Sequence, residues 1–296
     1  MRWEDFRQSD NIDDRRGEDF SGSGGGLPFG GGGLGIGTIL VLGILGYALG
    51  IDPRILIGGA EVISQRNQTQ YVEPARANRP TTPPTDQMGR FVSAVVAQTE
   101  DVWGEILPAQ KGLKYVAPKL VIFDGRTNSA CGLAQSAMGP FYCPVDQKIY
   151  LDTSFFNDMK RRLGGGGDFA YAYVIAHEVG HHVENQLGIL ARAQRAQQQG
   201  TKIDANRISV RVELMADCFA GVWAANADKK WQILEKGDIE KAINTAQAIG
   251  DDRLQQSARG SVVPDSFTHG SSAQRVEWLQ RGLQSGRIDS CNTFAR

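Results

Sequence analysis

Near the middle of the chain, two histidines lie four residues apart, and a glutamate directly follows the first: His177, Glu178 and His181. The surrounding residues read as one helix, and side chains four apart on a helix share a face. His177 and His181 can therefore bind one zinc ion. Glu178 leans to one side, where it can reach a water on the metal rather than the metal itself. Asp168, which follows four glycines at 164–167, is placed to cap the start of this helix.

A catalytic zinc takes three protein ligands and one water, so a third ligand is needed. Glu213 supplies a carboxylate on a later predicted helix that can cross the first. Asp217 lies four residues on, on the same face, where it can accept the free ring N–H of a ligand histidine. Ala216 is small and would let the two helices approach closely.

Other residues compete for the third position. Glu184 follows His181 by three residues on the same face, but three ligands from one straight helix would strain to surround a metal tetrahedrally. His182 is rotated by about 100° from His181 and should face elsewhere. Cys218 reads as a core or disulfide residue. The alternative for Glu213 and Asp217 is an exposed acidic pair without a metal. The apolar residues beside them indicate that this helix is buried, which argues against that alternative.

With zinc bound, these residue types suit hydrolysis by a zinc-activated water. Zinc lowers the pKa of bound water to roughly 7, and Glu178 can take its proton as general base and later donate it to a leaving amine. His269 lies just before a helix capped by Ser271 or Ser272 and is followed by Arg275. It is the candidate catalytic group that stabilises the oxyanion. The alternative is an exposed loop histidine.

The segment Gln147–Asp152 alternates polar and apolar residues and precedes the motif helix. As an edge strand, it could hold an extended peptide by main-chain hydrogen bonds. Lys148 or Tyr150 could then line the cleft. The alternative is an ordinary strand inside a sheet.

Strands ahead of an otherwise helical chain predict an α+β domain. Its expected strands are 120–123, 130–138 and 147–152. The expected helices are 88–106, 153–163, the motif helix to about Leu187, part of 188–203, 206–226, 239–249 and 272–283.

The composition allows a sizeable core, with 41% hydrophobic residues in 296. Lys plus Arg (32) nearly balances Asp plus Glu (33), which gives no support for a nucleic-acid partner. The four cysteines include no Cys-x-x-Cys pair, so a structural zinc ribbon is disfavoured. A local bridge between Cys131 and Cys143 is the first interpretation, and it would place the domain outside the cytosol. The alternative is four buried thiols.

The N-terminal part predicts a membrane anchor. Residues 1–33 are polar and then glycine-rich, which predicts disorder followed by a flexible linker. Leu34–Ile51 carries no charge and is about long enough for one transmembrane helix. A cleaved signal peptide would need a short basic head, and a core helix would need a polar face. Residues 52–84 read as a proline-bearing linker, so the folded domain is expected at 85–296.

The positive charges on the two sides of the expected span are nearly equal, so they do not decide the membrane orientation. Arg15 and Arg16 precede the expected span, and Arg54 and Arg66 follow it. The cysteines favour an N-terminus inside the cell and a domain outside it.

Six short motifs occur together in this chain: His177-Glu-Val-Gly-His-His182, Glu213-Leu-Met-Ala-Asp217, Gly139–Pro144, Lys148–Asp152, Thr268–Ser272 and Gln274-Arg275. In combination they resemble the neutral zinc metallopeptidase family of bacteria, a group of membrane-anchored, gluzincin-like proteins. The order of motifs is also similar to that of the membrane heat-shock and prenyl-protein metalloproteases, which have several spans where this chain shows one. The resemblance implies zinc binding and peptidase chemistry.

These observations together predict a zincin-like α+β domain behind a single span of the bacterial inner membrane, on its extracytoplasmic side. The predicted activity is zinc-dependent cleavage of protein or peptide substrates, with His177, His181 and Glu213 on the metal. One alternative is a zinc-binding scaffold that cleaves nothing, although an inactive relative would often lose the base Glu178. The other is a membrane assembly factor whose span oligomerises through its glycines.

Overall fold

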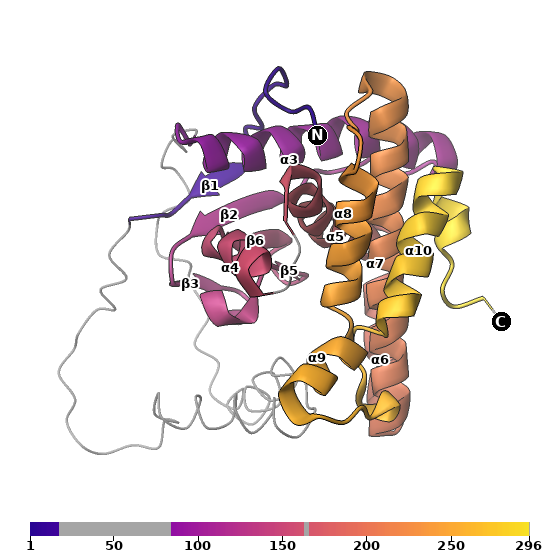
Figure 1. Ribbon diagram of the computed structural model, residues 1–296. Helices are drawn as coiled ribbons and strands as arrows, with labels where there is room; N and C mark the ends of the chain where they lie inside the picture. Colours follow the sequence, from indigo (N-terminus) through magenta and orange to yellow (C-terminus); the bar gives the residue numbers. More distant parts are fainter. Residues whose placement is uncertain (18–83, 163–165, 296) are drawn as a thin grey trace, which may run out of the picture. The chain divides into compact units, whose positions relative to one another are not determined.

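The structure consists of a small sheet and a mostly helical body (Figure 1). This confirms the predicted α+β class. The computed structural model describes residues 1–17, 84–162 and 166–295. These residues fall in one compact unit, Met1–Gly17 together with Thr81–Arg296. Among them, no helix has the length and apolar content needed to cross a bilayer. The expected span Leu34–Ile51 and nearly all of the expected linker lie outside the described residues.

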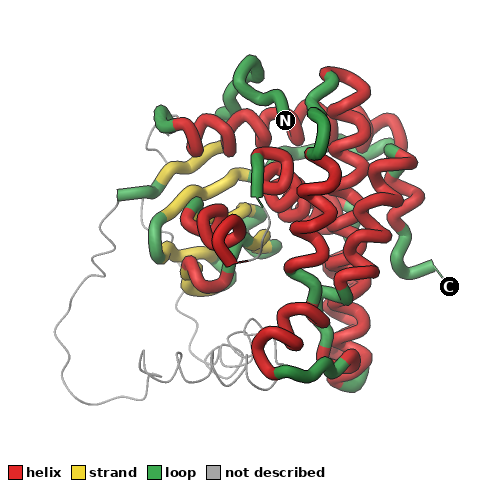
Figure 2. Tube along the Cα trace, viewed as in Figure 1, coloured by secondary structure: helices red, strands yellow, loops and turns green. Residues whose placement is uncertain are grey.

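The main sheet has the strand order β1-β2-β6-β5. Its first two pairings are parallel, and β5 runs antiparallel to β6. All residues of the two inner strands except the first of each are buried, as expected for strands covered by helices (Figure 2). The strands are β1 (Ile12–Asp14), β2 (Lys119–Phe123), β5 (Phe141–Cys143) and β6 (Lys148–Asp152).

Two expectations about strands are wrong. The segment expected as one strand at 130–138 instead contributes β4 (Gly132–Gln135), which pairs with β3 (Arg126–Ser129) in a separate hairpin, and a short 3-10 turn. Gly132 has φ 109°, a conformation that favours glycine and starts the return strand. The edge-strand hypothesis for Gln147–Asp152 also fails, because β6 is paired on both sides. The edge strand on that side is β5.

The helices follow the predicted order, and those expected at 88–106, 206–226 and 272–283 extend further than the periodicity indicated. An additional helix, α9, was not predicted. The helices are α3 (Gln87–Lys111), α4 (Ser154–Arg162), α5 (Asp168–Gln186), α6 (Ile189–Gln199), α7 (Lys202–Trp231), α8 (Asp238–Ala248), α9 (Asp251–Arg259) and α10 (Ser272–Ser285).

Close helix contacts depend on small residues. A Cβ on Gly180 of α5 would lie 3.0 Å from the carbonyl oxygen of Ala216 on α7, so the two backbones nearly touch. This confirms that Ala216 lets the helices approach. Between α7 and α10, Gly221 and Gly282 have the same role, because a Cβ on either would collide with the backbone of the other helix.

The expected disorder of residues 1–33 is wrong for residues 1–17, which pack into the domain. Met1 and Trp3 are each 6% exposed, and Ile12 is 3% exposed. The Trp3 ring N–H donates to Asp168 at 3.0 Å. Asp168 therefore does not cap α5 with its side chain, and the residue at the N-cap position is Gly167. Composition missed this segment because its few apolar residues are spread among charged ones.

Two disulfides hold the chain. Cys131–Cys143 is the predicted local bridge and joins the turn of the hairpin to β5. Cys218–Cys291 fastens α7 to the C-terminal 3-10 turn Ile288–Cys291. The alternative of four buried thiols is therefore wrong.

Candidate metal centre

The structure brings together the three side chains predicted as metal ligands. His177 and His181 come from α5, and Glu213 comes from α7. One ligand atom from each lies within 4.8 Å of the other two. His177 Nε2 is 3.1 Å from Glu213 Oε2, and His181 Nε2 is 3.6 Å from Glu213 Oε1. The contact between Gly180 and Ala216 sets the helix separation that allows these distances.

These distances fit a zinc ion. Tetrahedral donors at roughly 2.0–2.1 Å from zinc stand about 3.4 Å apart. The two histidine–glutamate separations, 3.1 Å to one oxygen of Glu213 and 3.6 Å to the other, are close to this value, and the ligand atoms as a group lie within 4.8 Å of one another. Both histidines also direct Nδ1 to a carboxylate, which leaves Nε2 for the metal. Two imidazoles and one carboxylate are a common ligand set of catalytic zinc sites, in which the fourth position holds water.

Asp217 orients His177 and takes the predicted supporting position. The side chain is fully buried, and Oδ1 accepts hydrogen bonds from His177 Nδ1 at 2.9 Å and from the Tyr173 hydroxyl at 2.5 Å. Arg275 donates to both carboxylate oxygens, at 2.8 and 2.9 Å. Burial disfavours the charged form, but Arg275 and His177 outweigh it and lower the pKa of Asp217 to about 2.

Glu184 has the same task for His181. Its Oε2 lies 2.8 Å from His181 Nδ1, on the far side of the ring from Nε2. With the histidine rings oriented in this way, Glu184 lies behind His181 and is not the third ligand, which was the alternative role considered for it. The side chain is fully buried, and burial raises its pKa to about 7 against the opposing effect of His181. The i, i+3 spacing that suggested a ligand instead makes a supporting pair.

Glu178 lies beside the ligands, one residue after His177 on α5, and is 7% exposed. No residue that the structure describes makes a hydrogen bond or ion pair with its carboxylate. This buried carboxylate next to the two histidines is therefore available to a water molecule.

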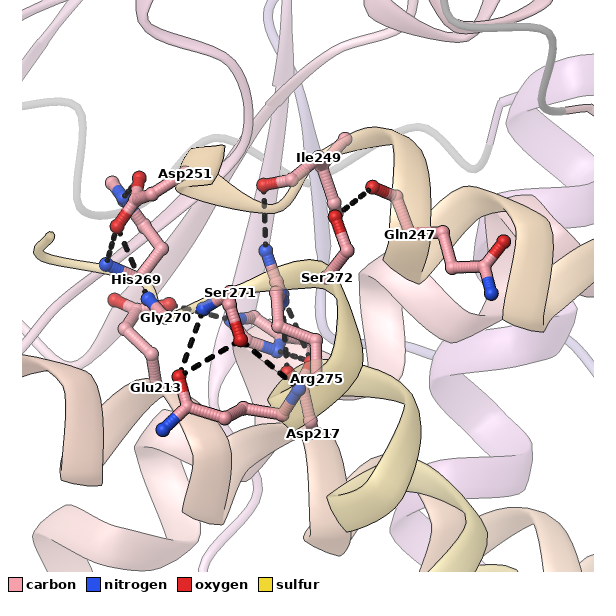
Figure 3. A network of polar contacts seen from close by, with 12 residues as sticks. Glu213, Asp217, Gln247, Ile249, Asp251, His269, Gly270, Ser271, Ser272 and Arg275 are labelled. Atoms are coloured by element: carbon pink, nitrogen blue, oxygen red, sulfur yellow. Dashed lines mark hydrogen bonds and ion pairs between the residues drawn. The ribbon is translucent and has the colours of Figure 1, made fainter. Parts of the chain in front are cut away.

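His269 approaches the centre from the loop before α10 (Figure 3). Its Nδ1 lies 3.2 Å from Asp251 Oδ1 and 3.0 Å from the Thr268 hydroxyl. Asp251 also accepts hydrogen bonds from three consecutive backbone amides of the loop, at residues 268–270. Burial raises the pKa of Glu213, but His181 and then His269 outweigh it and hold that pKa well below its usual range. The His269 side chain is 34% exposed.

The remaining candidates have structural roles. His182 places Nδ1 3.0 Å from the Tyr142 hydroxyl and Nε2 2.6 Å from the Val116 carbonyl, which ties α5 to the sheet. Cys218 is in a disulfide. Tyr150 is 1% exposed and lies inside the sheet, so it does not line a cleft.

The sequence reasoning missed three supporting roles. Tyr173 precedes His177 by four residues, so helix spacing could have indicated it. Arg275 was noted only as following His269, whereas it is 4% exposed and binds Asp217. Asp251 has no spacing relationship to His269 that could have revealed it.

A cavity of about 510 Å³ lies away from this centre, on the other face of α7. It is bounded by α6, α7 and the C-terminal turn, and none of the three predicted ligands lines it. The chemistry of the chain is therefore expected at the metal centre and not in this cavity.

Comparisons with known proteins give the family of the chain. The model of a family described as "putative neutral zinc metallopeptidase" matches residues 1–294. The chain is 49% identical over 300 residues to the uncharacterized protein YpfJ of Escherichia coli K12, covering 100% of this chain and 99% of that one. It is 43% identical over 220 residues to Mb2605 of Mycobacterium bovis and Rv2575 of Mycobacterium tuberculosis, covering 70% of this chain and 72% of each relative. No solved structure matches. The chain therefore belongs to the family described as "putative neutral zinc metallopeptidase".

Proposed function

We propose that the protein is a zinc-dependent endopeptidase held at the bacterial inner membrane by its apolar run, with the folded unit on the extracytoplasmic side. The observation that carries the proposal is the convergence of His177, His181 and Glu213, with their ligand atoms within 4.8 Å of one another. Glu178 adds a general base next to them. A purely structural zinc site would close the metal with four protein ligands, and this set offers three.

When bound, zinc would acidify a water molecule and polarise the scissile carbonyl. In this proposal, Glu178 would accept the proton of the attacking water and pass it to the leaving amine. Asp217 and Glu184 hold the two imidazoles in one tautomer, with Nε2 toward the metal position.

His269 is the proposed second donor to the oxyanion. Asp251 fixes the loop backbone on either side of it and contacts Nδ1, so the ring has a defined orientation. A positioned donor at the developing charge typically contributes a factor of about 10²–10³ in kcat. Arg275 does not share this task, because its guanidinium is buried against Asp217.

We propose that an extended peptide pairs with β5, the edge strand nearest the metal helix. Tyr142 of β5 lies 3.0 Å from Nδ1 of His182 on α5, so the strand runs beside the helix that carries the base. Protein or peptide chains are the substrates that such an edge can bind through main-chain groups.

The proposed location on the extracytoplasmic side rests on the disulfides and not on an observed spanning helix. Two disulfides form in the folded unit, and disulfides persist in oxidising compartments outside the cytosol. The apolar run Leu34–Ile51 would supply the membrane contact.

The test combines metal analysis of the purified full chain with cleavage of a denatured protein, with and without chelator. Glu178→Gln should keep zinc and lose at least about 100-fold in cleavage rate. Glu240→Gln, an exposed change on α8, is the matched control and should cleave normally. A Glu178→Gln protein that still cleaves would contradict the assignment of the base. A chain that binds zinc yet cleaves no denatured substrate would favour the scaffold alternative.

A further inference from the structure

The cavity bounded by α6, α7 and the C-terminal turn lies behind the metal centre. Its volume is about 510 Å³, within the range of about 300–1,000 Å³ that small-molecule sites occupy. Met215 and Phe219 of α7 line it. Because successive helix residues are rotated by about 100°, these two lie on the side of α7 opposite Glu213 and Asp217. The cavity is therefore separate from the metal centre, and the proposed chemistry does not use it.

The C-terminal turn Ile288–Cys291 forms one wall of the cavity and is firmly held. The disulfide between Cys218 and Cys291 fastens it to α7. The Ile288 amide also donates a hydrogen bond to the Gln110 side chain of α3 at 2.8 Å. Protein interiors leave few voids larger than a water molecule. A cavity of this size with a covalently fixed wall is therefore a preformed site for a ligand.

The walls of the cavity are mostly apolar, and one of them is elongated. Ile189, Ala193 and Ala196 of α6 line it, and spacings of four and three residues place them on one helix face. From the first to the last they extend over about 10 Å, at about 1.5 Å per residue. Met215 adds a flexible, adaptable surface. This shape and lining suit an unbranched hydrocarbon chain that lies along α6.

The charged residues of the cavity leave one positive charge without a partner. Lys111, Arg192 and Asp289 line the cavity. Lys111 and Asp289 form an ion pair with each other, so their charges offset. Arg192 is exposed, and its guanidinium makes no hydrogen bond or ion pair with any residue that the structure describes. A guanidinium beside apolar walls matches a carboxylate on an apolar chain, because it can bind both carboxylate oxygens.

We propose that this cavity binds a monoanionic amphiphile of the fatty-acid class. The carboxylate pairs with Arg192, and the acyl chain lies along α6 against Met215 and Phe219. A small inorganic anion would leave the apolar walls uncovered, and a cationic amphiphile would meet an uncompensated positive charge. The inference goes beyond the proposed peptidase function and does not depend on it.

Isothermal titration calorimetry of the full chain with dodecanoate, below the concentration at which it forms micelles, tests the charge preference. A saturable site for one dodecanoate per chain is expected. Dodecyltrimethylammonium has the same chain length and the opposite charge, and should bind at least about tenfold more weakly because like charges repel. Arg192→Gln should weaken dodecanoate binding about 3- to 10-fold through loss of the charge-assisted pair. Arg195→Gln, which is exposed on the same helix and outside the cavity, is the matched control and should bind normally.

Filling the cavity distinguishes this site from adsorption elsewhere on the chain. Ala196 is an exposed residue at the wall, so Ala196→Trp can fold and occupy the space of the acyl chain. It should weaken dodecanoate binding at least about tenfold. Ala191→Trp, at an exposed position of α6 outside the cavity, should bind as the unchanged chain does. A full chain that does not bind dodecanoate, or an Ala196→Trp protein that binds it equally well, would overturn the proposal.

Methyl-labelled methionine gives a second readout that locates the ligand by nuclear magnetic resonance. Met215 lines the cavity and is 3% exposed, whereas Met159 of α4 is fully buried and lies outside it. On saturation with dodecanoate the Met215 methyl resonance, assigned with Met215→Leu, should shift, and that of Met159 should stay in place. A Met215 resonance that does not move at saturation would overturn the proposed site.

Discussion

Arg275 holds the carboxylate of Asp217 by two parallel hydrogen bonds, Nε to Oδ2 at 2.8 Å and Nη2 to Oδ1 at 2.9 Å. Both side chains are buried, and the same carboxylate orients His177. Helix α10 therefore reaches a predicted metal ligand through two side chains, although it contributes no ligand itself.

Replacing Arg275 by Met should destabilise the domain strongly. The change leaves Asp217 as a buried, uncompensated charge, and breaking one side of such a pair typically costs about 3–5 kcal/mol. The free energy of unfolding from urea titration measures it. The control is Arg281→Met on the same helix, which loses an exposed pair with Glu277 and a contact of the guanidinium with the Trp278 ring at 4.2 Å, and should cost under about 1.5 kcal/mol. Equal effects of the two changes would contradict the role of Arg275.

Asp217→Asn and Glu184→Gln should each weaken zinc binding by about 10- to 100-fold, the usual effect of losing an orienting partner. Each changes the orienting partner of a different histidine. Competition with a chromophoric chelator measures the affinity. Glu240→Gln should bind zinc as the unchanged chain does. Unaltered affinity in both single variants would show that the imidazoles are oriented by other groups.

The chelated protein should lose stability in acid through Asp217. Its pKa is lowered from 3.8 to about 2 on folding, so its contribution is present above pH 3.8 and is lost as the pH falls toward 2. The shift corresponds to roughly 2 kcal/mol. Unfolding free energies of the chelated protein and of chelated Asp217→Asn, followed between pH 5 and 2, should converge as the pH falls. Parallel curves would mean that Asp217 does not titrate in this range.

Replacing glycine by alanine should have opposite effects on stability in α10 and in α3. Gly282→Ala should destabilise by more than about 2 kcal/mol, because its Cβ would collide with the Cys218 carbonyl and force α10 away from α7. Gly104 of α3 has no atom within 4 Å of an added Cβ. Gly104→Ala should therefore stabilise by about 0.5–1 kcal/mol, the helix-propensity gain. Thermal unfolding compares the two, and a tolerated Gly282→Ala would contradict the close packing of α7 and α10.

Helix spacing predicted which of these side chains share a helix face, because that geometry is local. His177 and His181 are neighbours on α5 by the helix period alone, and Glu213 and Asp217 repeat that period on α7. The crossing of the two helices was the one further assumption. The small side chain of Ala216 favoured it, because it allows the helices to approach closely. The short β5 was missed because three residues carry too little periodicity, and β6 was therefore taken for the edge.

Contacts between distant segments could not be predicted in this way. Trp3 meets Asp168, and Asp251 meets His269, through pairings that no sequence period encodes. Burial of Met1 and Trp3 outweighs the polar composition around them, so a segment that composition assigns to disorder is folded.

The contact of Gly180 with Ala216 has a consequence for the protein without its ion. Because main-chain atoms set the spacing of α5 and α7, no metal is needed to bring the three ligand side chains together. Stripping zinc with a chelator should therefore yield a folded, inactive protein that regains its ion without refolding, unlike small zinc domains that unfold when the metal is removed.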